Sequence, residues 1–136
     1  MTSTFKNKTL ACLLAIILGA VGAHRVYLHG WRDHWAWLHC AAVVLTILLL
    51  FGGNAGEFAY LPMVLSALVG MLMALVIGLT PDEKWDAIHN PGQSRRTESR
   101  WPLAVLLVLA MMLGATGLIA VMARSFDLLY TGGSYG

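Results

Sequence analysis

Charged residues are scarce in this sequence. Asp, Glu, Lys and Arg make up 12% of its 136 residues, whereas a soluble globular domain contains about 25%. Because 58% of the residues are hydrophobic, so short a chain cannot hide its apolar surface in one aqueous core. The net charge of +2 is too small to suggest nucleic-acid binding, and the basic residues stand in short runs between apolar blocks. The composition therefore predicts an integral membrane protein.

Cysteines and catalytic motifs are also lacking. Cys12 and Cys40 are too few for a disulfide scaffold, and on a helical hairpin their depths differ by on the order of 10 Å, beyond disulfide reach. The sequence has no acid pair, nucleophile–base pair, phosphate-binding loop or cofactor fingerprint. Asp86 and His89 lie three residues apart, but a hydrogen-bonded surface pair accounts for them. We therefore predict a protein that is not an enzyme and holds no cofactor.

Four apolar blocks predict four transmembrane helices. They run from about residue 9 to 23, 35 to 51, 58 to 79 and 101 to 122. A spanning helix needs about 20 apolar residues. The first block is shorter, so it can span only if its flanking charged side chains extend toward the lipid head groups. Its lysines and small residues are also typical of a cleaved secretory signal, but we favour a retained helix. The predicted fold is an all-α polytopic membrane protein that begins with a two-helix hairpin.

The chain divides into two predicted units. Residues 1–56 form the hairpin with its polar turn, and residues 57–136 form a second pair of transmembrane helices. The polar loop 80–100 joins the second pair and is expected to hold one helical turn around residues 82–88. A Gly-rich tail from residue 131 is predicted to be disordered.

The lysines and arginines predict an orientation. Four crossings would place both termini on one side, together with Lys6, Lys8 and Arg124. The other side would hold six basic residues: Arg25, Arg32, Lys84, Arg95, Arg96 and Arg100. Since basic loops stay in the cytoplasm, this second side, with loop 80–100, is predicted to be cytoplasmic. The five tryptophans would lie there as an interfacial belt.

Small residues form two stripes at spacings of four. The first apolar block carries Ala11, Ala15, Gly19 and Ala23. The third block carries Ser66, Gly70, Ala74 and Gly78. Because lipid provides no hydrophobic drive for helix association, such stripes indicate faces where helix backbones approach closely. They could close the monomer or join copies, and the pattern leaves both open.

The most distinctive stretch is the predicted turn after the first helix, GAHRVYLHGWRDHWAWLHC. Its polar residues favour a structural role, in which Arg25 and Arg32 bind lipid phosphates, Asp33 pairs with an arginine and Tyr27 anchors at the interface. A contact with a partner or a second copy is an alternative, as is a proton or ion path through His24 and Arg25. Metal binding is less favoured: the four histidines of this stretch recur every five residues, which rotates each by about 140° on a helix.

This turn and the preceding segment, KNKTLACLLAIILGAVGAHRVYL, resemble the TM-two domain family, also called NINE-type proteins. The family's lysine-led first helix ends in a motif like G-x-H-R-F-Y-L-G. Five residues match it: Gly22, His24, Arg25, Tyr27 and Leu28. Val26 stands in place of the usual aromatic residue, and His29 precedes Gly30. The resemblance covers residues 6–51 and implies a membrane hairpin in the bacterial inner membrane, but no established activity.

We therefore expect a membrane assembly or interaction module, with a small transporter or an ion- or proton-conducting oligomer as the alternative. Its expected partners are membrane lipid and either a second copy or another membrane protein, without nucleic acid. The candidate contact residues are those of the turn: Gly22, His24, Arg25, Tyr27, Leu28, Arg32 and Asp33. A basic cluster in the loop is expected to hold anionic lipid head groups: Arg95, Arg96 and Arg100.

Overall fold

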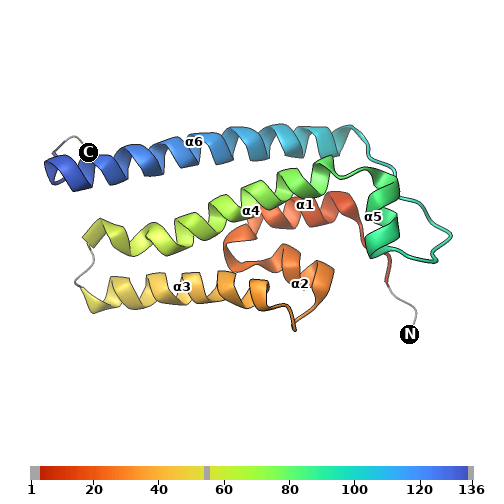
Figure 1. The fold of residues 1–136 in the computed structure, drawn as a ribbon, viewed down its shortest axis with the longest axis horizontal. Helices are drawn as coiled ribbons and strands as arrows, with labels where there is room; N and C mark the ends of the chain where they lie inside the picture. Colours follow the sequence, from red (N-terminus) through yellow and green to blue (C-terminus); the bar gives the residue numbers. More distant parts are fainter. Residues whose placement is uncertain (1–3, 54–55, 135–136) are drawn as a thin grey trace.

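The computed structural model describes residues 4–53 and 56–134, and these residues form helices and no strands. The elements are α1 (Lys8–Ile17), the 3-10 segment η1 (Gly19–Val21), α2 (Ala23–His29), α3 (His34–Gly52), η2 (Gly56–Tyr60), α4 (Leu61–Leu79), α5 (Asp82–His89) and α6 (Trp101–Thr131). Figure 1 shows α3, α4 and α6 as long rods, with α1 beside α4, α2 between α1 and α3, and α5 across one end. The predicted all-α class is confirmed for this part of the chain.

Three segments of the described chain are long and apolar enough to cross a membrane. They are α3, η2 together with α4, and α6. Their long apolar side chains point outward: Leu48, Leu72 and Ile119 are 63%, 59% and 67% exposed. Such exposure is unfavourable in water but suits contact with lipid acyl chains.

The first apolar block does not form a fourth spanning helix. α1 has 10 residues, which gives a length of about 15 Å, or half of the ~30 Å hydrocarbon core. Gly22 then adopts a left-handed conformation, with φ of 73°, and α2 runs back toward the start of α1. The Lys6 ammonium donates to the Tyr27 carbonyl at 2.6 Å, which fixes the return. The prediction of four crossings is therefore not confirmed, and residues 8–29 are called the α1–α2 hairpin below.

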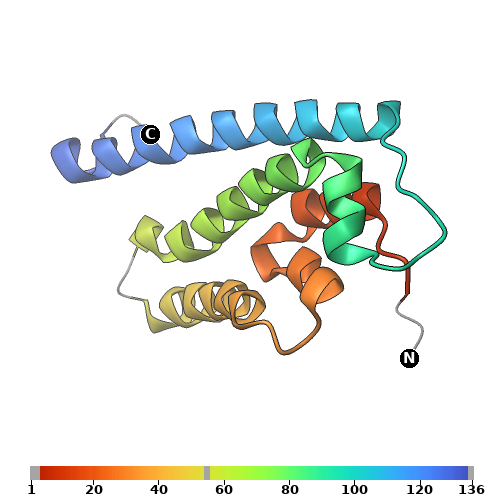
Figure 2. The same cartoon turned by 45° about the vertical axis from the view of Figure 1, so that its right-hand side comes forward.

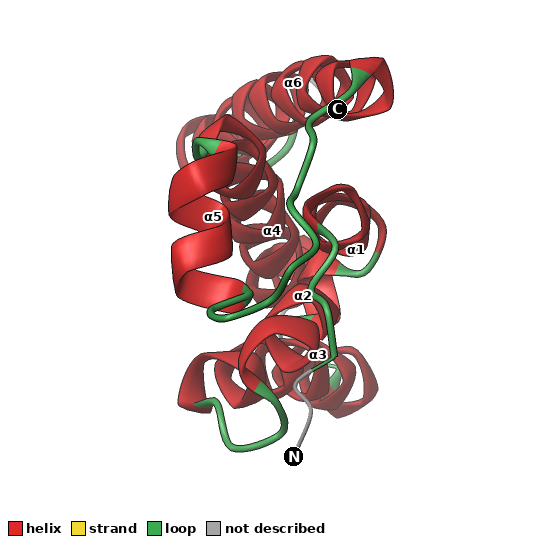
Figure 3. Ribbon diagram, turned by 90° about the vertical axis from the view of Figure 1, so that its right-hand side faces the viewer, coloured by secondary structure: helices red, strands yellow, loops and turns green. Residues whose placement is uncertain are grey.

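Two stripes of small residues bring α1 against α4. A Cβ built on Gly70 would lie 2.6 Å from the Gly19 Cα, so the two backbones touch. Gly70 is the tenth of the 19 residues of α4, and the end of the hairpin thus reaches the middle of that helix. Ala23, the last member of the first stripe, lies instead in α2. Seen from the end, α4 lies between α6 and α3, with α1 beside it (Figure 3).

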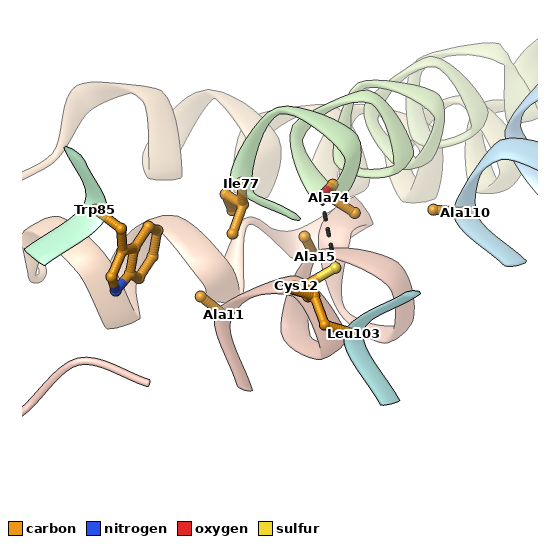
Figure 4. Close-up of a cluster of buried hydrophobic side chains, with 8 residues drawn as sticks. All are labelled: Ala11, Cys12, Ala15, Ala74, Ile77, Trp85, Leu103 and Ala110. Atoms are coloured by element: carbon orange, nitrogen blue, oxygen red, sulfur yellow. Dashed lines mark hydrogen bonds between the residues drawn. The ribbon is translucent and has the colours of Figure 1, made fainter. Parts of the chain in front are cut away.

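The core lies where α1, α4, α5 and α6 meet. Figure 4 shows its buried side chains: Ala11, Cys12, Ala15, Ala74, Ile77, Trp85, Leu103 and Ala110. Most are small, so helices approach closely and van der Waals contact is extensive. The Cys12 thiol lies 3.5 Å from the Ala74 carbonyl oxygen. Farther along α4, the Leu107 side chain packs against Gly78 and occupies the space that a Cβ would need.

The start of the described chain lies at the α5 end of the molecule, and α6 ends at the opposite end (Figure 2). The Lys6 amide donates to the Asn90 side chain at 2.7 Å, so Lys6 and Lys8 lie on the side of loop 80–100. This corrects the predicted grouping of the N-terminal lysines with Arg124. Trp85 is buried rather than part of an interfacial belt, and its indole donates to the Lys6 carbonyl.

The last helix is longer than expected. α6 continues to Thr131, nine residues past the predicted end at 122, because its polar residues find partners. The Arg124 guanidinium contacts both carboxylate oxygens of Glu57, at 2.6 and 2.7 Å. Residues 132–134 form a bend and a turn. The rest of the predicted disordered tail, residues 135–136, lies outside the described residues.

Candidate functional site

The reversal between α1 and α2 depends on Gly22. Its φ of 73° disfavours side chains with a Cβ. A Cβ there would also lie 2.9 Å from the His39 Cβ and 3.1 Å from the Ala36 carbonyl oxygen of α3. Glycine is thus required both by the backbone conformation and by the approach of α3. The first glycine of the family motif therefore holds the hairpin against the first long helix.

Tyr27 closes the base of the hairpin. Its phenolic oxygen accepts the Asn7 amide at 2.8 Å, and its carbonyl accepts the Lys6 ammonium. The same ammonium lies 4.8 Å from the centre of the Tyr27 ring. Tyr27 therefore ties the end of α2 to the N-terminal segment. Leu28, the next motif residue, packs against the hydrophobic core.

Arg25 and Asp33 form an ion pair at the start of α3. Their side chains lie 2.6 Å apart. Asp33 also caps α3 by accepting the Trp35 amide. The hydrogen bond from Arg25, followed by the amide bond, holds the pKa of Asp33 below its usual range despite some burial. Arg32 is exposed at the same turn. Asp33 therefore pairs with an arginine, in the arrangement that the polar turn predicts.

The hairpin end carries a buried polar cluster. The Ser66 hydroxyl of α4 donates to the Ala20 carbonyl at 2.7 Å, and His39 Nδ1 of α3 lies 2.6 Å from the same hydroxyl oxygen. The His24 ring stands edge-on to the His39 ring, with centroids 5.6 Å apart. Three segments thus meet through polar groups at the level where the hairpin ends. We call His24, His39 and Ser66 the histidine cluster.

His24 is fully buried, and both of its ring nitrogens lack a hydrogen-bond partner. Among the described residues, every other buried side-chain nitrogen or oxygen atom has a hydrogen-bond partner. A neutral imidazole has one donor and one acceptor, so leaving both unpaired in an apolar environment is costly. Such a group in a native fold calls for a specific explanation, such as a bound polar species or a functional role.

A groove runs between α3 and α4 beside this cluster. It has a volume of about 390 Å³, and His39 and Ser66 form the polar part of its wall. The rest is apolar and includes Leu38, Ala42 and Leu65. Leu38 and Leu65 are 59% and 47% exposed, so the groove opens toward the surroundings of the bundle. His39 is not among the predicted contact residues, although an ionisable residue within an apolar helix is a usable signal of a site.

A second polar network fastens the N-terminal segment to loop 80–100. The Lys8 side chain is buried and lies 2.8 Å from Asp82. Asp82 also accepts the Ser99 amide at 2.7 Å. Burial alone would raise the pKa of Asp82, but the hydrogen bonds from Lys8 and Ser99 outweigh it and lower the pKa. Asp86 resembles Asp82: burial opposes ionisation, but bonds from Asn90 and Thr97 lower its pKa.

The predicted basic cluster lies at the mouth of a cavity next to this network. Arg95, Arg96 and Arg100 are all exposed and line a space of about 650 Å³ together with the N-terminal segment. The histidine cluster and the basic cavity are therefore separate, while Tyr27 of the turn is linked to the cavity through Asn7. The histidine cluster lies at the end of the α1–α2 hairpin, and the basic cavity lies near its base.

Residues 4–54 match the family model of the TM2 domain, which confirms the resemblance to TM-two domain proteins. The matched segment contains α1, η1, α2 and α3, and therefore the whole hairpin and the two histidines. No curated protein and no solved structure matches the chain.

Proposed function

Because residues 4–54 of this integral membrane protein carry a TM2 domain, we propose that the chain is a non-enzymatic assembly module. Its α3–α4 groove receives a transmembrane helix of a second polypeptide. The observation that carries this proposal is the His39–Ser66 pair in the wall of an otherwise apolar, outward-facing groove. A polar pair beside lipid gains from a partner that supplies a hydrogen-bonding group.

The shape of the groove also favours a helix. The groove follows α3 from Trp35 to Leu45, a length of about 15 Å at the helical rise. Ala41 and Ala42 stand in its wall, and such small side chains allow a helix backbone to approach closely. Contact with a helix would bury the exposed side chains of Leu38 and Leu65 and leave the opposite face, on α6, in lipid.

Site-specific photo-crosslinking in native membranes tests the proposal. A photoreactive residue at Leu38 or Leu65 is expected to capture a protein, whereas the same residue at Ile119 or Met112, on exposed α6, captures mainly lipid. A second copy and a different membrane protein are told apart by the mass of the adduct. Lipid adducts alone at every position would reject the assembly role.

A groove-filling variant makes the test specific. Ala42→Trp is expected to abolish the adduct formed from Leu65, because the indole occupies the space of the partner helix. The matched variant Met112→Trp adds the same side chain to lipid-exposed α6 and should leave the adduct unchanged. An adduct that survives Ala42→Trp would show that the captured protein does not use the groove.

The charge distribution supports one orientation. Of the nine lysines and arginines, Lys6 and Lys8 contact Asn90 and Asp82. Four more lie in α5 or in the loop between α5 and α6: Lys84, Arg95, Arg96 and Arg100. Basic residues near span ends are retained in the cytoplasm, so the α5 end is cytoplasmic in this proposal, in a bacterial inner membrane. The N-terminal lysines, which oppose this orientation when four crossings are assumed, support it when there are three. Labelling of Ser94→Cys in inside-out vesicles, but not in right-side-out vesicles, is the expected result.

Proton conduction is the second candidate, and the buried His24 favours it. An imidazole without partners can exchange protons with a neighbouring ring through a water molecule. In liposomes with an enclosed pH-sensitive dye, a conducting protein would dissipate an imposed proton gradient, and His24→Leu would abolish that flux. The matched variant His34→Leu, at the exposed start of α3, should retain it. Absence of flux with the unaltered protein rejects this candidate.

A further inference from the structure

The cavity beside the basic cluster has the composition of an anion site. It lies between the N-terminal segment, with Phe5, Asn7 and Thr9, and the loop that leads into α6. Its volume of about 650 Å³ is large enough for a phosphate ester and its substituents. Three arginines and one carboxylate, Glu98, line it, so its charge is positive.

The arginines differ in how they are held. The Arg95 guanidinium lies 4.6 Å from the centre of the Phe5 ring, and a guanidinium placed on an aromatic face keeps its N–H groups free at its edge. Arg100 contacts Glu98 at 3.1 Å, but both side chains are more than 70% exposed, so this pair is weak and open to exchange. Arg96 also borders the carboxylates of α5. Arg95 and Arg100 are therefore the residues available to a ligand.

The position of the cavity indicates where its ligand comes from. Pro102, in its wall, is the second residue of the spanning helix α6, and the neighbouring Trp101 is 77% exposed. An exposed tryptophan at the start of an apolar helix is typical of the level of lipid head groups. Leu10 and Val105, on the adjoining helices, are exposed as well and continue the surface along which acyl chains would lie.

We infer that this cavity binds the phosphate of an anionic phospholipid, with Arg95 and Arg100 as the contacting cations. Planar guanidinium groups match the oxygens of a phosphate through paired N–H bonds. The hydroxyl of Thr9 and the amide side chain of Asn7 offer further polar contacts in the wall. The inference does not depend on the assembly role, because the groove and the cavity lie on different parts of the bundle.

The test compares two variants that lower the net charge equally. Arg95→Gln with Arg100→Gln removes two positive charges from the cavity, and Lys84→Glu lowers the charge by the same two units on exposed α5, outside the cavity. Each full-length protein is placed in nanodiscs of phosphatidylcholine with increasing phosphatidylglycerol, and the retained phosphatidylglycerol is counted by native mass spectrometry. The cavity variant is expected to bind phosphatidylglycerol about 10- to 30-fold more weakly, and the control to change by less than about threefold.

A further variant distinguishes a specific binding site from general electrostatic attraction of lipid to the basic surface. Phe5→Leu leaves every charge in place but removes the ring that supports Arg95, so it should weaken binding by about threefold. Equal losses in the cavity double variant and in Lys84→Glu, or no effect of Phe5→Leu, would show surface attraction and overturn the inference.

A second experiment distinguishes a phospholipid ligand from free phosphate. Inorganic phosphate is added to nanodiscs of phosphatidylcholine alone, and protection of Arg95 and Arg100 from an arginine-specific reagent is measured. Protection by phosphatidylglycerol but not by inorganic phosphate is the expected result. Protection by inorganic phosphate alone would overturn the assignment to lipid.

Discussion

The contact between Gly19 and Gly70 yields the sharpest prediction. In Gly70→Ala, the added Cβ would stand 2.6 Å from the Gly19 Cα and 2.9 Å from the Ala15 carbonyl oxygen, both backbone atoms that cannot rotate away. Ordinary contact begins at 3.4 Å, so the hairpin must move away from α4 by about 0.8 Å. The same movement would stretch the 2.7 Å bond from Ser66 to the Ala20 carbonyl to about 3.5 Å, beyond good hydrogen-bond length.

The expected loss of stability follows from these two effects. Overpacking of a tight contact costs about 1–3 kcal/mol, and a hydrogen bond between membrane helices contributes about 0.6 kcal/mol on average. We therefore expect Gly70→Ala to lower the free energy of unfolding by about 2–3 kcal/mol. Unfolding in mixed micelles, titrated with a denaturing detergent and followed by circular dichroism, measures this quantity.

The control is Gly52→Ala, near the end of α3, where an added Cβ would meet no atom within 4 Å. Because alanine favours helices, this variant should be neutral or more stable by up to about 1 kcal/mol. If Gly70→Ala is as stable as the unaltered protein, the hairpin end does not touch α4, and the assignment of the histidine cluster fails with it.

Four further results are expected. Reporter fusions should place the N-terminus in the cytoplasm and the C-terminus outside, whereas four crossings would place both on one side. Asp82→Asn should cost about 2–4 kcal/mol, because it leaves the buried Lys8 ammonium without its counter-charge, and Lys8→Met should cost less; the reverse order would contradict a buried cation. The pKa values of Asp82 and Asp86 are lowered in the fold. Their stabilisation is therefore present above about pH 4 and lost as the pH falls through the lowered values. Smaller hydrogen-exchange protection factors of the α5 amides are expected in acid, and unchanged protection factors would refute this. Gly22→Ala should destabilise the fold by at least about 1–2 kcal/mol, since φ is 73° there; a neutral effect in the same detergent titration would exclude the left-handed turn.

The long helices could be predicted from hydropathy because each is a continuous apolar run. The predicted block 35–51 differs from α3 by one residue at each end, and Pro102 lies in the first turn of α6, where its missing amide proton is harmless. Gly19 and Gly70, one from each small-residue stripe, pack closely, whereas the pattern left the partner of each stripe open. Lipid-facing and protein-facing residues are both apolar in a membrane helix, so the pattern cannot say which face meets which.

The reversal after α1 could not be predicted in the same way. Residues 19–23, GAVGA, are as small and apolar as residues that continue a membrane helix. Hydropathy therefore gives no sign that Gly22 adopts a left-handed conformation. The contacts that fix the reversal are also distant in the chain, since Lys8 and Asp82 are 74 residues apart. Without those partners, the assumption of four crossings placed Lys6 and Lys8 on the wrong side. The contact between the His24 and His39 rings could not be predicted either.

The partners of the N-terminal segment have a consequence for biosynthesis. Gly19 packs on Gly70, Lys8 pairs with Asp82, and the Lys6 amide bonds to Asn90, 84 residues later in the chain. At a translation rate of about 5–20 residues per second, Lys6 waits roughly 4–17 s for its partner. The contacts that hold α1 in place therefore form only after α4 and α5 have been synthesised. Until then Lys8 lacks the carboxylate that pairs with it in the folded protein.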